Sequence, residues 1–438
     1  MTAFYFVLTG LIFLCVYWNI PCRHRRLLLL ICNPLFMCAF GIEFFLLHLV
    51  SAVANFTLAR SIQAFPTKGR AFVTIAVLFN VGLILFYKIK VQTIDSYIIP
   101  LGLSYYTFVN LGFVLDTYRK KIAPIQTFFN FYIFSGFFPT FLMGPIERAE
   151  DLWGQLAQNR TWNWTLLSSG SYLISLGLFK KFVIADRLHD LANPTNLYAH
   201  HFSGISLWIF YLLSFIQIYC DFSSYIDIVR GFAKLMHIDL KENFRQPYLA
   251  KSVPEIWSRW NITLVDWLRT NIYMPILLRT KNLYLASLLV MLAIGMWHSM
   301  AWNFAIWALY WSALYWIHIT LRLRGLTLVK SNSLRIASML IAMIFSTSLI
   351  SSQSFSALQS NLLRAFIPNF SLLPLFSSDL LNTQLVTIVF VSTIFAIFLE
   401  TFYYKEFQRK NLYNFILAVV IILLCLIFGV SNSWDRLG

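Results

Sequence analysis

The stretch LYLASLLVMLAIGMWHSM, residues 283–300, places a histidine at the end of a long apolar run. Leu283 to Met296 is almost wholly apolar, and the following run from Ala301 to Ile317 is apolar and rich in Trp and Tyr. A titratable imidazole at membrane depth is costly to keep, so His298 is a functional-site hypothesis by default. Histidine is also the side chain most easily poised for proton transfer near neutral pH. The alternative is a structural histidine that caps a helix or bonds a neighbouring carbonyl.

The composition extends this membrane interpretation to the whole chain. Of the 438 residues, 59% are hydrophobic and only 12% are charged, whereas soluble domains are about 45–50% apolar and about 25% charged. The apolar runs are long and do not alternate, which predicts spanning helices rather than barrel strands. The predicted fold is therefore all-α, a polytopic transmembrane bundle of roughly 10–12 helices, some re-entrant, around a central cavity.

No separate soluble domain stands out along the chain. Residues 1–438 are predicted to form one membrane domain, with N-terminal helices in 1–95, a motif-bearing core in 96–330 and C-terminal helices in 331–438. The predicted spans include Leu27–Val50, Ile98–Leu115, Phe128–Met143, Leu166–Ala185 and Leu283–Trp297.

The formal net charge of +16 is carried largely by short basic clusters between apolar runs, among them Arg23–Arg26, Arg119–Lys121 and Lys180/Lys181. This pattern is the membrane-topology signal, and it predicts a multi-pass protein of the cytoplasmic (inner) membrane with these clusters on the cytoplasmic side. It does not indicate nucleic-acid binding. The six cysteines show no metal-ligand spacing, so no metal site is predicted.

The longest stretch of low hydrophobicity, Leu235–Arg279, is crowded with Trp, Arg, Asn, Asp and Pro. We interpret it as a folded functional segment. Six segments in order carry a recognisable pattern: Arg25–Leu30 with Leu35-Phe36, Pro100–Phe108 with Asp116–Arg119, Phe137–Pro139 with Gly144–Arg148, Asp221–Tyr225, Glu242–Tyr248 with Trp257–Trp260, and Gly295–His298 with Trp302-Asn303.

Together these segments resemble the membrane-bound O-acyltransferases, most closely the bacterial alginate O-acetyltransferase-like branch. The resemblance covers most of the chain. One departure concerns the site, because the bacterial pattern usually has histidine where this chain has Asn261. Ser299 also replaces the usual glycine after the histidine.

Acyl transfer from a thioester to a hydroxyl needs a base for the hydroxyl proton and a donor for the developing oxyanion. We expect His298 to be the base and the Asn261 amide to bond the oxyanion or orient the acceptor. Further candidates for substrate or donor binding are Trp257, Arg259, Trp260, Asp221, Tyr225, Glu242, Asn243, Arg269 and Trp297. The arginines suit a phosphate-bearing donor or nearby carboxylates, and most carboxylates are interpreted as internal ion-pair partners.

The resemblance implies no bound cofactor and an acyl thioester donor, such as acetyl-CoA or another acyl-CoA, on the cytoplasmic side. The implied acceptor is a hydroxyl of a cell-envelope glycan, reached directly or through a periplasmic or extracellular partner protein. Acetyl is the favoured acyl group. The alternatives are D-alanyl transfer to teichoic acid and a transporter or channel without chemistry, which should tolerate His298→Ala.

Overall fold

The computed structural model describes residues 2–93, 99–121, 125–158, 161–192, 202–352, 354–371, 383–406 and 411–429. The regular elements among these residues are helices, and the only extended pairing among them is an isolated antiparallel bridge between Phe244 and Trp260. The predicted all-α class is confirmed. Two compact units are distinguished, Met1–Ile174 with Val229–Glu242 and Ser175–Ile228 with Asn243–Gly438. Each is described by itself.

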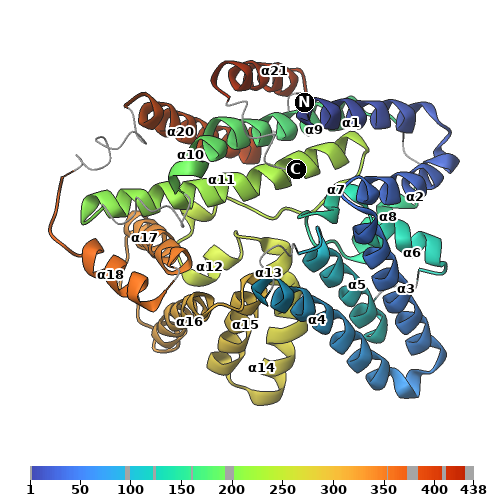
Figure 1. Cartoon of the computed structure of the whole chain (residues 1–438), viewed down its shortest axis with the longest axis horizontal. Coiled ribbons are helices and arrows are strands. Elements are labelled where there is room, and N and C mark those ends of the chain that lie inside the picture. Colours follow the sequence, from blue (N-terminus) through green and yellow to red (C-terminus); the bar gives the residue numbers. More distant parts are fainter. Residues whose placement is uncertain are drawn as a thin grey trace. The chain divides into compact units, whose positions relative to one another are not determined.

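The first unit contains the N-terminal helices, with α3, α4 and α5 packed side by side (Figure 1). Polar side chains bond between these helices: the Asn80 amide donates to Asn55 at 2.8 Å, and the Asn110 amide donates to Ser51 at 3.1 Å. Such bonds hold membrane helices together, because lipid offers no hydrophobic drive for their association. The elements are α1 (Thr2–Asn19), α2 (Cys22–Cys38), α3 (Ile42–Ala64), η1 (Pro66–Lys68), α4 (Gly69–Thr93), α5 (Leu103–Tyr118), α6 (Phe128–Ser135), α7 (Phe138–Phe141) and α8 (Ala149–Leu156).

Two predicted spans of this unit are wrong as single helices. Leu27–Val50 breaks between α2 and α3 at Gly41, whose φ of 146° is a conformation that residues with a side chain rarely adopt. Phe128–Met143 breaks between α6 and α7, where Pro139 occupies the first turn of α7. Proline favours a helix start because it has no N–H to lose there. The predicted span Ile98–Leu115 corresponds to α5, and its first residue lies outside the described residues.

The second unit contains the remaining helices, and α9 and α11 contribute to both units. Its elements are α9 (Trp164–Phe179), η2 (Lys180–Ala185), α10 (Asp186–Ala192), α11 (Ile205–Leu235), η4 (Pro247–Leu249), α12 (Val253–Trp257), α13 (Ile262–Leu268), η5 (Arg269–Tyr273), α14 (Met274–Thr280), α15 (Leu283–His298), α16 (Trp302–Leu323), α17 (Asn332–Ser351), α18 (Phe355–Ala365), α20 (Thr383–Glu406) and α21 (Asn411–Phe428).

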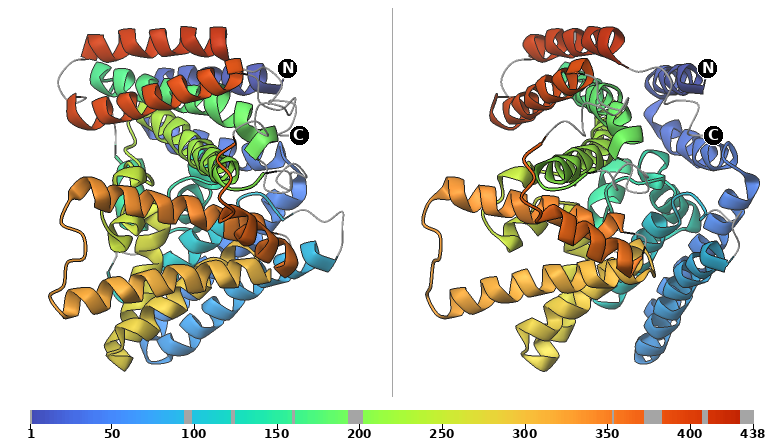
Figure 2. Two further views of the ribbon diagram at one scale, coloured as in Figure 1. Left: turned by 90° about the vertical axis from the view of Figure 1, so that its left-hand side faces the viewer. Right: turned by 60° about the vertical axis from the view of Figure 1, so that its left-hand side comes forward.

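Helices α15, α16 and α17 form a packed row in this unit (Figure 2). The Trp316 indole on α16 donates to the Tyr284 carbonyl on α15 at 3.1 Å, and the Tyr310 hydroxyl donates to the Ala342 carbonyl on α17 at 3.0 Å. Because both carbonyls belong to helix backbones, these bonds fix α16 against its two neighbours.

Five helices among the described residues are long and apolar enough to cross a membrane, and they lie at Ile42–Ala64, Pro66–Val91, Ile205–Leu235, Trp302–Leu323 and Asn332–Ile350. Shorter apolar helices accompany them, including Leu283–His298. The chain is a multi-pass membrane protein.

The basic pair Lys180/Lys181 lies within the predicted span Leu166–Ala185, at its end. Both residues lie in η2, a π-helical turn that continues α9 without a break. The Lys180 side chain is buried and ion-paired with Asp227 and Glu400, so it cannot act as a loop charge.

Candidate functional site

His298 is the last residue of α15, and its side chain is exposed. Aromatic rings surround the imidazole: the ring centroid of Trp297 lies 4.5 Å away, that of Phe304 5.8 Å away and that of Trp307 5.9 Å away. The helix ends because Ser299 and Ala301 turn the chain into α16 in an extended conformation. The histidine is therefore presented at a helix end, framed by rings from two helices.

Gly295, one turn before His298, marks the closest approach of α15 to α16. A Cβ atom at this position would lie 2.7 Å from the Phe304 carbonyl oxygen and 3.2 Å from the Ala308 side chain. Only glycine therefore allows the two helices to pack at this distance, and the packing brings Phe304 and Trp307 against the imidazole.

Three indoles form a buried cluster that continues from His298. The ring of Trp307 on α16 lies 5.9 Å from that of Trp257 on α12, which lies 5.2 Å from that of Trp311. All three side chains are buried, and in the described part of the chain their indole N–H groups have no hydrogen-bond partner. Buried donors are normally paired, so such groups call for an explanation at a candidate site.

Asn261, four residues after Trp257, begins α13 in a left-handed conformation with φ 44°. Asparagine tolerates this region better than most residues, and so does histidine. This shared tolerance gives a physical reason why either residue type fits the position. The Asn261 side chain is buried, and its Oδ1 has no partner among the described residues.

Asn243 performs the capping role that Asn261 would normally have. An asparagine that begins a helix usually accepts a hydrogen bond from the helix's first turn, yet Asn261 makes no such bond. Instead the Oδ1 of Asn243 accepts from the Thr263 backbone N–H at 3.1 Å and from its hydroxyl at 2.5 Å. The Asn243 backbone carbonyl accepts from the Ile262 N–H at 2.9 Å. The Asn261 side chain is thereby left free of capping.

Arg259 and Trp260 lie in the segment that leads into Asn261. The Arg259 guanidinium donates to Glu255 at 2.8 and 3.0 Å and to the Arg245 carbonyl at 3.0 Å. Partial burial alone would raise the pKa of Glu255, but the Lys251 backbone N–H and the Arg259 guanidinium hold that pKa below its usual range. Arg259 thus has internal partners, while Arg269, at the start of η5, is exposed.

The carboxylates among the predicted candidates are ion-paired, in agreement with their interpretation as internal partners. Asp221 on α11 pairs with Lys181 at 2.7 Å. Glu242 belongs to the first unit and pairs with Arg230 at 3.5 Å. Tyr225 is half-buried on α11, and Trp297 is half-buried beside His298.

The structure brings His298, Trp297 and Trp257 together through Trp307, and it places Asn243 against the start of α13 beside Asn261. The sequence analysis missed Trp307 and Trp311. Their signal was the high Trp content of the apolar run after Met300, but which of several tryptophans faces the histidine depends on the packing of α15 against α16.

The fold and these residues define an all-helical integral membrane protein in which an exposed histidine contacts a cluster of buried indoles, and one of these indoles lies four residues before an uncapped asparagine. A family model described as MBOAT, membrane-bound O-acyltransferase family, matches residues 55–360. The chain belongs to this family.

Curated relatives include the probable alginate O-acetylases of Azotobacter vinelandii and Pseudomonas aeruginosa. The first is 29% identical over 336 residues, covering 72% of this chain and 66% of the relative. The second is 30% identical over 319 residues, covering 68% and 61%. The peptidoglycan O-acetyltransferase of Helicobacter pylori is 28% identical over 328 residues, covering 65% and 62%. The chain thus matches somewhat under two thirds of the length of these relatives.

Proposed function

We propose that this chain is a membrane O-acyltransferase that moves an acyl group, favoured as acetyl, from a thioester donor to a hydroxyl of a cell-envelope glycan. The observation that carries the proposal is the exposed imidazole of His298 at a helix end, in ring contact with Trp307, which in turn contacts Trp257, four residues before Asn261. The relatives are named for O-acetylation of alginate and of peptidoglycan, and these names support a glycan acceptor.

The chemical step follows from the two side chains. His298 takes the proton of the acceptor hydroxyl while the hydroxyl oxygen forms a bond to the thioester carbonyl carbon. The Asn261 amide N–H donates to the carbonyl oxygen as it gains negative charge. The C–S bond then breaks, and the leaving thiolate receives the proton from the imidazolium. No cofactor takes part in this sequence.

The donor is proposed to be an acyl-CoA, with acetyl-CoA as the simplest case, entering from the cytoplasmic face of the inner membrane. The acyl group reaches the glycan directly or through a periplasmic or extracellular partner protein. Exposed Arg269 is a candidate for the donor phosphates, because guanidinium and phosphate pair in a bidentate manner.

The test is transfer of labelled acetyl from acetyl-CoA in proteoliposomes supplied with envelope glycan. We expect label in the glycan with the wild-type chain and none with His298→Ala. Label from a D-alanyl thioester but not from acetyl-CoA would favour the teichoic acid alternative. Donor movement across the membrane that survives His298→Ala, without any label in glycan, would favour a transporter.

A further inference from the structure

A buried charge cluster lies in the second unit, formed by Lys180, Asp227, Glu400, Tyr219 and Tyr248. Lys180 is 1% exposed, and its ammonium lies 2.5 Å from Asp227 and 3.0 Å from Glu400. The Lys180 ammonium also donates to the Ser223 hydroxyl at 2.9 Å. A buried lysine persists only when its charge is paired and its donors are satisfied, and both conditions are met here.

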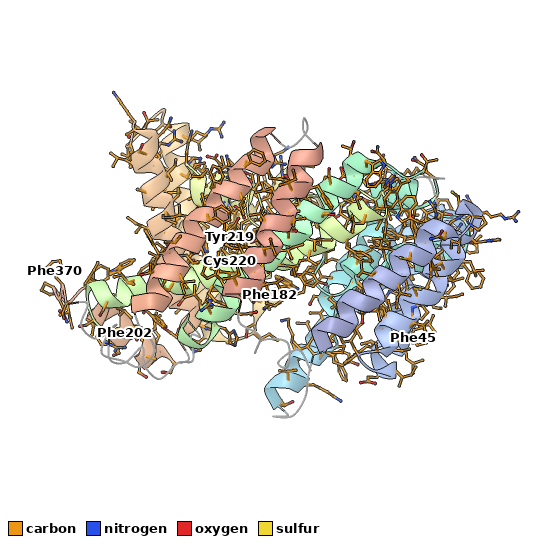
Figure 3. All side chains as sticks on the ribbon, turned by 90° about the horizontal axis from the view of Figure 1, so that it is seen from above. Phe45, Phe182, Phe202, Tyr219, Cys220 and Phe370 are labelled. Atoms are coloured by element: carbon orange, nitrogen blue, oxygen red, sulfur yellow. The ribbon has the colours of Figure 1, made fainter. Side chains whose placement is uncertain are left out.

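Glu400, on α20, is the centre of this cluster. Its carboxylate accepts from the Tyr219 hydroxyl at 2.8 Å and from the Tyr248 hydroxyl at 2.7 Å, in addition to Lys180. Figure 3 labels Tyr219 and Cys220 on α11, where α20 passes. Glu400 lies beyond residues 55–360, so it stands outside the part of the chain that the family model describes.

The contacts of α20 lead to Asn261 in three steps. First, Glu400 holds Tyr248, and the next residue, Thr401, accepts a bond from the Gln246 amide at 2.8 Å. Two consecutive residues of α20 therefore fix the segment 246–248.

The second step is the pairing of this segment with the residues before Asn261. Phe244 forms the antiparallel bridge with Trp260, and the Arg245 N–H donates to the Arg259 carbonyl at 2.9 Å. The ring of Tyr219, itself bonded to Glu400, lies 5.8 Å from that of Phe244 and 6.1 Å from that of Trp260.

The third step is the backbone itself, because Asn261 follows Trp260 directly and is held in its left-handed conformation by this pairing on one side and by the Asn243 cap on the other. From these contacts we infer that Glu400 is a positioning residue for Asn261, acting through Tyr248 and the 244–260 pairing. The expected effect on acyl transfer rests on the proposed function. The expected effect of Glu400 on the order of residues 243–262 does not.

The experiment compares Glu400→Leu, Glu400→Gln and Tyr248→Phe with a matched control, Thr393→Val. Thr393 lies on the same helix, and its hydroxyl bonds the Val389 carbonyl of its own helix. Each variant is purified in detergent and reconstituted, and two quantities are measured: hydrogen–deuterium exchange of residues 243–262 and the kcat and KM of acetyl transfer.

For Glu400→Leu we expect exchange in 243–262 to rise about tenfold or more, because the segment loses its anchor. We expect kcat to fall about 10²-fold, the order expected for a misplaced site group, with KM nearly unchanged. Glu400→Gln keeps one acceptor for a tyrosine hydroxyl and should recover part of both losses, while Thr393→Val should match the wild type. Tyr248→Phe should lie between Glu400→Gln and Glu400→Leu.

Wild-type exchange in 243–262 and unchanged kcat in Glu400→Leu would overturn the inference. If Glu400→Leu does not fold, Thr401→Val and Tyr248→Phe remove the two anchors singly, and wild-type behaviour of both would overturn it equally. A wild-type chain without transferase activity would instead sink the proposed function, and the exchange result would still decide the role of Glu400.

Discussion

Two of the histidines in apolar helices of this protein, His48 and His298, have opposite surroundings. His48, within α3, is fully buried; its Nε2 lies 3.0 Å from the Ser135 hydroxyl, and the rings of Tyr106, Tyr132 and Phe141 enclose it. His298 lies at the end of α15 and is exposed.

The comparison teaches that an imidazole at membrane depth is not sufficient evidence of a site. The argument that singled out His298 applies equally to His48, which the sequence analysis did not consider. The hydroxyl of Ser135 links His48 to Asn110 at 2.5 Å, and Asn110 bonds Ser51. His48 therefore belongs to a polar network that joins helices, whereas His298 is exposed at a helix end.

The largest expected effect separates these two histidines. His298→Ala should reduce acyl transfer by about 10²–10⁴-fold, the usual cost of removing a general base, while the protein inserts and stays monodisperse. His48→Ala should keep its activity per folded molecule but lose about 1–3 kcal/mol of stability, because the buried Ser135 hydroxyl loses one of its two hydrogen-bond partners and retains only Asn110. Transfer rates and thermal unfolding of both variants test this, and the reverse pattern would exchange the two assignments.

The next largest effect on transfer is expected at Asn261. Variants at this position can separate the contribution of the side-chain amide from that of the left-handed backbone conformation. Leucine at this position would lose the amide and would also add about 1–2 kcal/mol of left-handed strain. Asn261→Gly loses the amide without that strain, so it is the sharper variant.

We expect Asn261→Gly to fold and to lose about 10²-fold in transfer, the order measured for one oxyanion donor. Asn261→His should retain part of the activity, because histidine both donates a hydrogen bond and tolerates the conformation. Equal rates for the glycine variant and the wild type would show that Asn261 is a structural residue only.

Much of the fold follows from the sequence, and the breaks within it do not. The helix predicted at Leu283–Trp297 is present and ends one residue later, at His298, because the chain turns at Ser299. The break at Gly41 was not predicted, since a glycine within an apolar run is also common in membrane helices. The site shows the same division: His298 and Asn261 follow from local patterns, while Trp307 and Glu400 depend on which helices pack together.

Gly295 tests the packing that frames His298. Gly295→Ala would place a Cβ atom 2.7 Å from the Phe304 carbonyl, so α16 must shift and carry Trp307 away from the imidazole. A loss of about tenfold in transfer is expected from a small displacement. The control is Gly82→Ala on α4, where an added Cβ meets nothing within 4 Å. Equal transfer rates for Gly295→Ala and Gly82→Ala would show that Gly295 does not set the packing around His298.

The last effect is on stability rather than on transfer, and it concerns a carboxyl group in the first unit. Burial raises the pKa of Glu147 to about 7, although the Lys241 backbone N–H donates to it at 2.7 Å. The pKa of Glu147 in the folded protein lies above its ordinary value of 4.5. Between pH 4.5 and about 7, the folded protein therefore keeps a proton on Glu147 that the unfolded chain has released. The stabilisation that this proton gives is complete below about pH 4.5. It is lost as the pH rises to about 7, and the free energy of unfolding falls by about 3 kcal/mol over this range.

Thermal unfolding of the wild type and Glu147→Gln in detergent between pH 4.5 and 7.5 checks this sign. The wild type should lose stability relative to the glutamine variant as the pH rises. A constant difference between the two across the range would contradict the assignment.

Rescue by added imidazole tests the central claim, that His298 supplies an accessible proton acceptor for acyl transfer. The measurement is the acetyl transfer rate of His298→Gly and His48→Gly proteoliposomes at increasing imidazole concentration, with acetyl-CoA binding followed in parallel. We predict that the rate of His298→Gly starts near zero and rises with imidazole, while donor binding and the rate of His48→Gly do not change. Wild-type transfer by His298→Gly in the absence of imidazole would contradict the account.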